Sequence, residues 1–265
     1  MSGPEPTFQT PLLQRIYKII REEVDPEFSF ASPGPVPWAA PPGSLAGVRV
    51  ALLSTAGLHL KGDPPFRALE EPMGDTSFRV IPHGSVPEAM ALDAPYVDDK
   101  YVSHDLEVAL PMKALEQLHR EGHVGPPAPR HLGFCSGVVR PYPGLAESSK
   151  RAAAILSEDH VGAVVLLPTC SLCVQTVCVV ARELEARGFP TVALSLLPEL
   201  SEIVGAPRVL SVHFPFGAPC GNPGHGELHR AVLLEALTLL SDDTTPGEIR
   251  ASRHAWRRTP SPDTE

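Results

Sequence analysis

Two cysteines with two residues between them, Cys170 and Cys173, form the motif that is best placed to do chemistry. They follow an apolar run at 161–167 that is typical of a buried strand, and they precede a helical pattern at 174–187. At a helix start, the dipole and free backbone amides favour a thiolate, so we expect Cys170 to be a nucleophile at neutral pH. Cys173 can then resolve a mixed sulfide by forming a disulfide with Cys170. The alternative is two small buried residues.

The other three cysteines have more than one interpretation. Cys178 falls within the predicted helix and is expected to be a core residue, whereas Cys135 ends a neighbouring strand and either lines the same pocket or packs in the core. An iron–sulfur site would use Cys178 or Cys220 beside Cys170 and Cys173, in a spacing that matches no common cluster pattern. A zinc site would need a fourth ligand such as His225 or Cys220. We therefore expect no metal site.

Polar residues also follow other predicted strands. The turn that contains Ser54, Thr55 and Gly57 offers hydroxyls and a glycine, which suit it to holding a substrate carboxylate through backbone N–H groups. An ordinary turn at the end of a strand is the alternative. His213 ends the last predicted strand and is a further candidate for substrate binding.

Three more candidates lie in segments without a clear periodicity. Asp75 and Arg79 are spaced so that they can clamp a substrate, or can order their own loop as an ion pair. His104 is a candidate acid or base, with a surface histidine as the alternative. The chain has no G-x-G-x-x-G, no Walker loop and no G-x-S-x-G, which argues against nucleotide binding and serine hydrolysis.

The elements that must position these residues alternate between strands and helices. Short connections between them predict an α/β fold with a mostly parallel sheet and helices on both faces, in Rossmann- or flavodoxin-like layers. Active sites of such sheets lie at the carboxyl ends of strands, so we expect Cys170, Cys135, Ser54 and His213 around one cleft. The predicted strands are 47–53, 131–134, 161–167, 190–194 and 209–213, and the predicted helices are 11–24, 111–121, 147–156, 174–187, 197–204 and 227–240.

Composition divides the 265 residues into three parts. Residues 1–46 are predicted to form a helix and a proline-rich strap. Residues 47–257 are predicted to form an α/β domain, either as one unit or as two sub-lobes with a break near 125–130. An irregular region is expected to include residues 63–79, and the chain becomes polar after Asp242, with a frayed tail at 258–265. The 31 prolines exclude an all-helical bundle.

Charge and patterning narrow the partners and the compartment. The net charge of −9 argues against binding to nucleic acids or anionic membranes. One uncharged run at 161–181 is long enough to span a bilayer, but it changes character at Pro168, as a buried strand followed by a buried helix would. An odd number of cysteines without a signal peptide indicates a cytoplasmic protein.

Several blocks of the sequence are distinctive, and the most diagnostic of them is TCSLC at 169–173. The others are VALLSTAGLH at 50–59, KGDPPF at 61–66, GDTSFR at 74–79, VSH at 102–104, GAPR at 205–208 and FPFGAPCGNPG at 214–224. With these blocks, the chain resembles the selenoprotein B component family of glycine, sarcosine and betaine reductase and D-proline reductase over roughly residues 38–256.

The resemblance implies roles for the cysteine pair. Cys170 stands where the family has selenocysteine, and Cys173 would be its partner thiol. The family's selenolate cleaves a carbon–nitrogen bond reductively, in a small substrate that a pyruvoyl group on a separate subunit activates as a Schiff base. This chain departs from the family by having cysteine at position 170. The resemblance implies no cofactor within the chain itself.

These observations lead to one leading hypothesis and two alternatives. We expect a thiol-dependent reductase that cleaves a carbon–nitrogen or carbon–sulfur bond, with Cys170 as nucleophile, Cys173 resolving, and an external dithiol or thioredoxin-like reductant. The first alternative is a non-redox cysteine enzyme, a racemase, lyase or desulfurase, in which Cys135 faces Cys170 as acid or base. The second is an accessory subunit whose cysteines serve a metal or the structure. A homo-oligomer is compatible with each of them.

Overall fold

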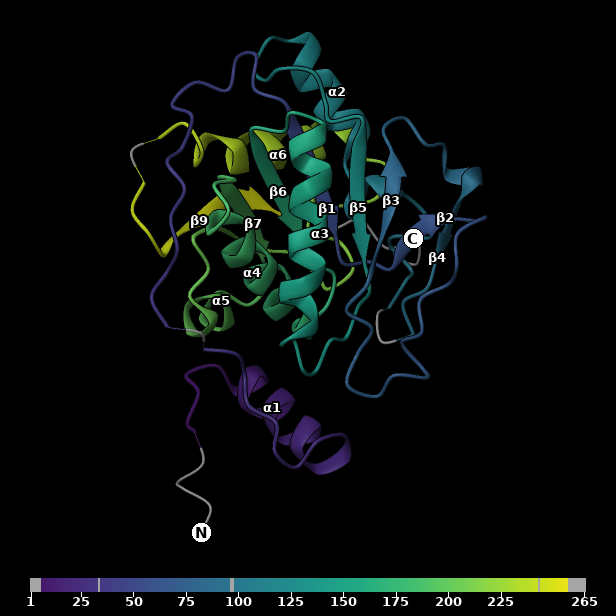
Figure 1. Ribbon diagram of the computed structural model, residues 1–265, viewed down its shortest axis with the longest axis vertical. Coiled ribbons are helices and arrows are strands. Elements are labelled where there is room, and N and C mark those ends of the chain that lie inside the picture. Colours follow the sequence, from purple (N-terminus) through teal and green to yellow (C-terminus); the bar gives the residue numbers. More distant parts are fainter. Residues whose placement is uncertain (1–5, 33, 96–97, 243, 257–265) are drawn as a thin grey trace, which may run out of the picture.

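A seven-stranded sheet forms the centre of the computed structural model, which describes residues 6–32, 34–95, 98–242 and 244–256 (Figure 1). In spatial order its strands are β3 (Phe78–Pro82), β5 (Arg130–Phe134), β1 (Val50–Ser54), β6 (Ala163–Leu167), β7 (Thr191–Ser195), β8 (Arg208–His213) and β9 (Glu248–Ala255). Neighbouring strands are parallel except β3 and β5, which are antiparallel. The predicted α/β fold with a mostly parallel sheet is confirmed.

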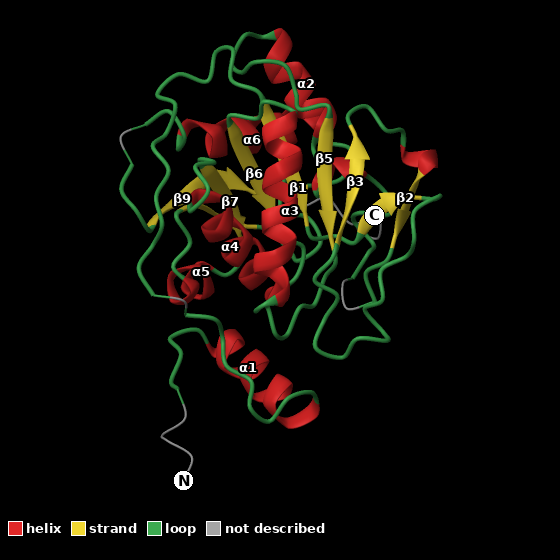
Figure 2. Cartoon of the chain, in the orientation of Figure 1, coloured by secondary structure: helices red, strands yellow, loops and turns green. Residues whose placement is uncertain are grey.

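Helices cover both faces of the sheet. On one face, the side chains of Leu53 and Leu166 pack in the same apolar cluster as α3 (Gly144–Glu158), α4 (Ser171–Glu185) and α5 (Pro198–Val204). On the other face, Leu52 and Leu167 pack with α2 (Met112–Arg120) and α6 (Gly226–Thr238). Successive side chains of a strand point to opposite faces, so continuously apolar strands are buried on both sides. Figure 2 shows α3 and α4 in front of the strands.

The uncharged run at 161–181 contains a strand and the start of a helix, as predicted. β6 ends at Leu167 and α4 begins at Ser171, three residues earlier than the apolar spacing indicates. The difference arises because the first turn of α4 contains residues that the apolar pattern does not detect. Among the described residues, the structure has no helix that is both long and apolar enough to cross a membrane.

Several strands lie where the sequence predicts irregular or merely polar chain, and these expectations are wrong. β3 falls at the end of the region expected to be irregular, and β2 (Leu58–Leu60) pairs with β4 (Met90–Leu92) as a small antiparallel sheet. Strands of three residues are too short to show a period. β9 lies in the polar C-terminal part, and every second residue from Ala251 to Ala255 is exposed because β9 is an edge strand. Two short 3₁₀ helices, η1 (Pro87–Ala89) and η2 (Leu106–Val108), complete the elements.

The N-terminal helix α1 (Pro11–Glu23) begins after Thr10, as predicted. Its flanking segments contact two helices that follow strand ends: Thr10 N–H donates to Glu199 in α5, and Ala31 N–H donates to Gln175 in α4. The proline-rich strap is attached by a buried ion pair between Arg208 and Glu185, both of which bond the backbone of Ala39. The proposed domain boundaries remain predictions, and the tail at 258–265 lies outside the described residues.

Candidate functional site

Cys170 and Cys173 lie at the N-terminus of α4, directly after β6. Cys170 is the N-cap residue, and its Sγ accepts the backbone N–H of Cys173 at 3.1 Å. The two sulfur atoms are joined as a disulfide with a Cα–Cα distance of 4.8 Å. Cys170 is 8% exposed, whereas Cys173 is fully buried. Of the two residues, Cys170 is therefore the one that solvent or a ligand can reach.

Thr55, at the end of β1, connects that strand to the cysteine pair. Its carbonyl oxygen accepts the hydroxyl of Thr169 at 3.1 Å and lies 3.6 Å from Sγ of Cys173. Its own backbone N–H donates to the carbonyl oxygen of Leu167 at 3.1 Å. The loops after β1 and β6 are thus held side by side at the carboxyl edge of the sheet.

The turn at residues 54–57 has its backbone N–H groups already engaged. Thr55 N–H binds Leu167, Ala56 N–H binds the hydroxyl of Ser54 at 3.3 Å, and Gly57 N–H binds the carbonyl oxygen of Phe134 at 3.0 Å. Ser54 and Thr55 are fully buried. The N–H groups of this turn therefore connect the ends of β5, β1 and β6. The sequence analysis expected the same groups to bind a substrate carboxylate.

The two candidate histidines are both exposed. His213 is exposed at the end of β8 and is in register with Ala255 of β9, while β7 separates β8 from β6. The loop after β8 nevertheless returns to the pair, because Gly217 N–H donates to the carbonyl oxygen of Thr169 at 2.7 Å. His104 is exposed, and its Nδ1 lies 2.6 Å from the carbonyl oxygen of Lys100 in its own turn.

The three free cysteines are buried and poorly suited to acid–base chemistry. Cys135 packs with Phe66 and Ala68, and burial, reinforced by the charge of Asp75, raises its pKa to about 12. Burial also raises the pKa of Cys178 to about 12 and raises that of Cys220. Cys178 and Cys220 belong to the apolar clusters on opposite faces of the sheet. Within the described chain, no group of three or more His, Cys, Asp or Glu residues is arranged to hold a metal ion.

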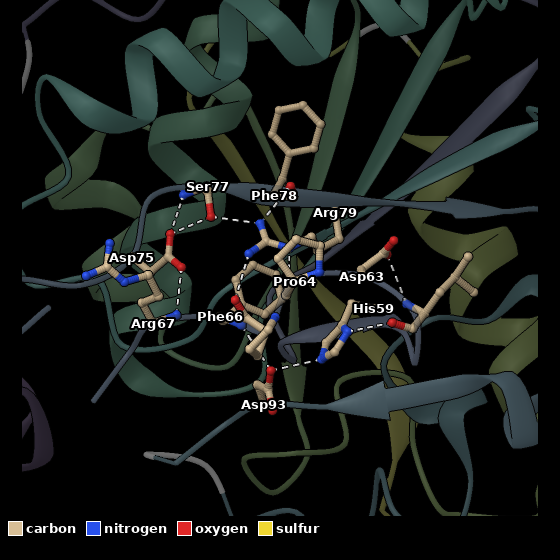
Figure 3. A network of polar contacts seen from close by, with 12 residues as sticks. His59, Asp63, Pro64, Phe66, Arg67, Asp75, Ser77, Phe78, Arg79 and Asp93 are labelled. Carbon is tan, nitrogen blue, oxygen red and sulfur yellow. Dashed lines mark hydrogen bonds and ion pairs between the residues drawn. The ribbon is translucent and has the colours of Figure 1, made fainter. Parts of the chain in front are cut away.

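Asp75 and Arg79 order the loop before β3 (Figure 3). Ser77 bridges the two, since its hydroxyl donates to Asp75 and accepts from Arg79 at 2.9 Å. Burial opposes ionisation of Asp75, but hydrogen bonds from Ser77 and the backbone of Arg67 outweigh it and lower its pKa. Arg79 lies 4.4 Å from the centre of the Phe66 ring and donates to the carbonyl oxygens of residues 64 and 65.

Sequence reasoning missed a histidine–aspartate pair in the same region. His59 of β2 is buried, and its Nε2 lies 2.9 Å from Oδ2 of Asp93. A polar residue between two leucines of a short strand was the available signal. Asp93 follows β4 and lines an open cavity of about 420 Å³, together with Phe66, Arg67, Ala68, Leu69, Glu70, Leu92, Ala94, Pro95 and Asp99.

Comparison with known proteins finds relatives among the subunits of amino-acid reductases. D-proline reductase subunit gamma of Acetoanaerobium sticklandii is 32% identical over 219 residues, which cover 82% of this chain and 88% of that subunit. Two further relatives are each 26% identical: sarcosine reductase complex component B subunit beta of Peptoclostridium acidaminophilum and glycine reductase complex component B subunit gamma of Symbiobacterium thermophilum. They match 82% and 87% of this chain, which spans about half of their lengths, 52% and 54%.

The remaining comparisons add no further relative. No protein-family model matches the chain, and no solved structure matches it. The relatives are named as components of D-proline, sarcosine, glycine and betaine reductases. With 32% identity across most of both chains, the protein belongs to the family of D-proline reductase gamma subunits and glycine, sarcosine and betaine reductase component B subunits.

Proposed function

We propose that this protein is the thiol-bearing component of a reductase complex that cleaves the carbon–nitrogen bond of a small amino acid. Its relatives are named for the reduction of D-proline, sarcosine, glycine and betaine, each of which contains such a bond. The cysteine pair at the start of α4 would carry the electrons. The proposal includes Cys170 as nucleophile and Cys173 as the resolving thiol.

One observation carries the assignment of these two roles, namely the different surroundings of the two sulfur atoms. Sγ of Cys170 faces a hydrogen-bond donor, the N–H of Cys173 at 3.1 Å, whereas Sγ of Cys173 faces an acceptor, the carbonyl oxygen of Thr55 at 3.6 Å. A donor stabilises a thiolate and an acceptor stabilises a protonated thiol. After reduction, the negative charge would therefore settle on Cys170, which is also the more exposed of the two.

The reaction requires two bond exchanges. The Cys170 thiolate attacks the substrate carbon, so that a sulfur–carbon bond forms, the carbon–nitrogen bond breaks, and nitrogen keeps the electron pair and a proton. The Cys173 thiolate then attacks the Cys170 sulfur, so that the disulfide forms and carbon leaves with an electron pair and takes a proton. The dithiol is oxidised by two electrons, the substrate is reduced by two, and the protons come from the two thiols.

Two reaction partners complete the proposal. An external dithiol or a thioredoxin-like protein would reduce the disulfide for the next turnover. A carbonyl group, such as a pyruvoyl group on a partner subunit, would form a Schiff base with the substrate nitrogen and so make that nitrogen a better leaving group when Cys170 attacks. The relatives are named as subunits of complexes, which supports a partner subunit of this kind.

The test uses the chain in complex with the subunits that co-purify with it. D-proline, sarcosine, glycine and betaine are supplied with dithiothreitol, and the products and the intact mass of the chain are measured. Cys170→Ser should abolish turnover and adduct formation, because no sulfur remains at position 170 to attack. Cys173→Ser should trap the substrate fragment on Cys170 as a mass increase, because no thiol can resolve it.

Cys178→Ala serves as the matched control. This thiol is fully buried in α4 and its pKa is raised to about 12, so its loss should leave turnover within about twofold of the unmodified protein. Substantial turnover in Cys170→Ser would overturn the nucleophile assignment. An adduct on a cysteine other than Cys170 would do the same.

A further inference from the structure

A buried hydroxyl group lies between the end of β1 and the cysteine pair. Oγ1 of Thr169 is 3.1 Å from the carbonyl oxygen of Thr55 and 3.5 Å from Sγ of Cys173. Thr169 and Cys173 are both fully buried. Apart from the disulfide bond, Thr169 provides the one side-chain polar contact to this sulfur atom among the described residues. A change in the charge of Cys173 is therefore felt first by this hydroxyl group.

The backbone of Thr169 is fixed by the loop that follows another strand. Its carbonyl oxygen accepts the N–H of Gly217, in the loop after β8, at 2.7 Å. Gly217 has a φ of +89°, and a Cβ there would lie 2.8 Å from the carbonyl oxygen of Asp98. Contacts with the chain after β1 and after β8 therefore hold Thr169 beside Cys173.

A hydroxyl group can match either form of a neighbouring thiol, because it has one hydrogen to donate and lone pairs that accept. When its hydrogen points at the carbonyl oxygen of Thr55, its lone pairs face Sγ and accept the S–H of reduced Cys173. A thiolate has no hydrogen and can only accept, so it attracts the hydroxyl hydrogen to itself. Both acceptors lie within reach of one O–H group, and a rotation about its C–O bond is sufficient to change partner.

The resolving step requires a negative charge at a position that otherwise opposes it. The carbonyl oxygen of Thr55, 3.6 Å from Sγ of Cys173, is an acceptor and favours the protonated thiol. A buried charge is costly unless a donor stabilises it, and Cys173 is closed to solvent. The hydroxyl group of Thr169 is the nearby donor that can lower this cost.

We propose that Thr169 is a positioning residue for the resolving step: its hydroxyl group accepts a hydrogen bond from the Cys173 thiol in the reduced protein and turns to donate to the Cys173 thiolate as that thiolate attacks Sγ of Cys170. The inference deepens the proposed function, on which it rests, by naming the group that supports the second thiol. The first attack does not use this hydroxyl group, because Sγ of Cys170 faces the backbone N–H of Cys173.

The test follows the two sulfur exchanges separately with dithiodipyridine, a neutral disulfide that needs neither substrate nor partner subunit. The full chain is reduced, freed of reductant and mixed with the probe, and the absorbance of released thiopyridone is recorded by stopped flow. Cys170 attacks the probe, the S–S bond of the probe breaks and one thiopyridone leaves. Cys173 then attacks Sγ of Cys170, its proton passes to water and the second thiopyridone leaves. The dithiol is oxidised by two electrons and the probe is reduced by two.

Two cysteine variants assign the phases of this reaction. Cys173→Ser should show the first phase alone, because no thiol remains to displace the second thiopyridone. Cys170→Ala should show neither phase on the same time scale, because the remaining cysteines are buried.

Variants of Thr169 should change the second phase selectively. Thr169→Val and Thr169→Ala lack the hydroxyl group and should slow that phase by about tenfold or more, as the loss of a hydrogen bond to a charged group implies, with the first phase within about threefold of the unmodified chain. Thr169→Ser keeps the hydroxyl group and should keep both phases within about threefold. Thr176→Val is the matched control: this buried hydroxyl group donates to the carbonyl oxygen of Leu172 at 3.2 Å, so its loss should leave both phases unchanged.

Three outcomes would overturn the role of Thr169. The first is a second phase of normal rate in Thr169→Val and Thr169→Ala. The second is equal slowing of both phases, which would mark the residue as structural. The third is a slow second phase in Thr169→Ser, in which the hydroxyl group is present.

The probe reaction distinguishes this inference from the proposed function. Turnover of the amino-acid substrates by Cys170→Ser would overturn the nucleophile assignment and leave the effect of Thr169 on the probe reaction intact. Loss of turnover in Cys170→Ser, together with a second phase that does not depend on Thr169, would overturn the role of Thr169 alone.

Discussion

The carbonyl oxygen of Thr55 lies 3.6 Å from Sγ of Cys173, so the chain at the end of β1 contacts the cysteine pair that follows β6. The same oxygen accepts the hydroxyl of Thr169, and the N–H of Thr55 donates to Leu167. A strand end that both bonds its neighbour and contacts a cysteine holds that cysteine in one orientation. Cys173 is therefore positioned by the end of a neighbouring strand, while Cys170 is the more exposed residue of the pair.

Alkylation of the cysteines should follow their exposure. In the native oxidised protein, iodoacetamide should label none of the five cysteines, because two form the disulfide and three are buried. After mild reduction, Cys170 should be labelled first, since it is 8% exposed and the other four are fully buried. Peptide mass mapping over time gives the order of labelling.

The matched control for this order is Cys170→Ala, which should leave the reduced native chain unlabelled over the same interval. Reduction in denaturant should expose the remaining cysteines of this variant to iodoacetamide. Their labelling under these conditions would show that enough reagent is present. Labelling of Cys173 or Cys135 ahead of Cys170 would contradict the described burial.

Gly57→Ala should be much more damaging than Gly43→Ala, although the two glycines have nearly the same backbone conformation, with φ of +73° and +72°. Both variants pay the cost of a side chain in the left-handed region, about 1 kcal/mol. A Cβ at Gly43 meets nothing, whereas a Cβ at Gly57 collides with the Asp93 backbone. Overpacking of this kind should cost Gly57→Ala about 2 kcal/mol more, measured as the free energy of unfolding in urea. Equal stabilities of the two variants would show that residues 57 and 93 are not in contact.

Much of the fold could be predicted because the central strands carry a strong local signal. A continuous run of apolar residues at Ala163–Leu167, followed by a turn and a helical pattern, determines β6 and α4 without knowledge of the rest of the chain. β2 and β4 could not be found this way, because each has three residues and is stabilised by its partner rather than by its own pattern. β9 lacks an apolar run because none of its eight side chains is buried: three are exposed and five are half-buried.

The candidate site likewise contains residues that local sequence patterns could place and residues that only long-range contacts bring together. The placement of Cys170 at a helix start, and of Ser54 and Cys135 at neighbouring strand ends, follows from the alternation of strands and helices. The contact between His59 and Asp93 joins residues that are 34 positions apart through the pairing of β2 with β4, which no local pattern reports. Whether a strand-end residue offers a free N–H also depends on long-range contacts, as the engaged N–H groups at 54–57 demonstrate.

The free energy of unfolding should decrease as the pH is lowered because of His131, which is fully buried in β5. Its Nδ1 accepts the N–H of Leu52 at 3.0 Å, so its proton is on Nε2, which lies 2.9 Å from Nδ1 of His83. Burial, reinforced by the charge of His83, lowers the pKa of His131 from 6.5 to about 3. Between these two values the unfolded chain binds a proton that the folded chain does not, so each pH unit below 6.5 should cost about 1.4 kcal/mol.

His131→Asn isolates this contribution to the free energy of unfolding. The asparagine oxygen can still accept the N–H of Leu52, whereas the side chain no longer titrates. The variant should be less stable than the unmodified protein at pH 8, because its bond to His83 is lost. Between pH 8 and pH 5, however, the unmodified protein should lose about 2 kcal/mol more than the variant, measured by urea unfolding at both pH values. Parallel losses in the two proteins would mean that His131 takes up its proton in the folded state as readily as in the unfolded chain, which the described burial and hydrogen bonds do not allow.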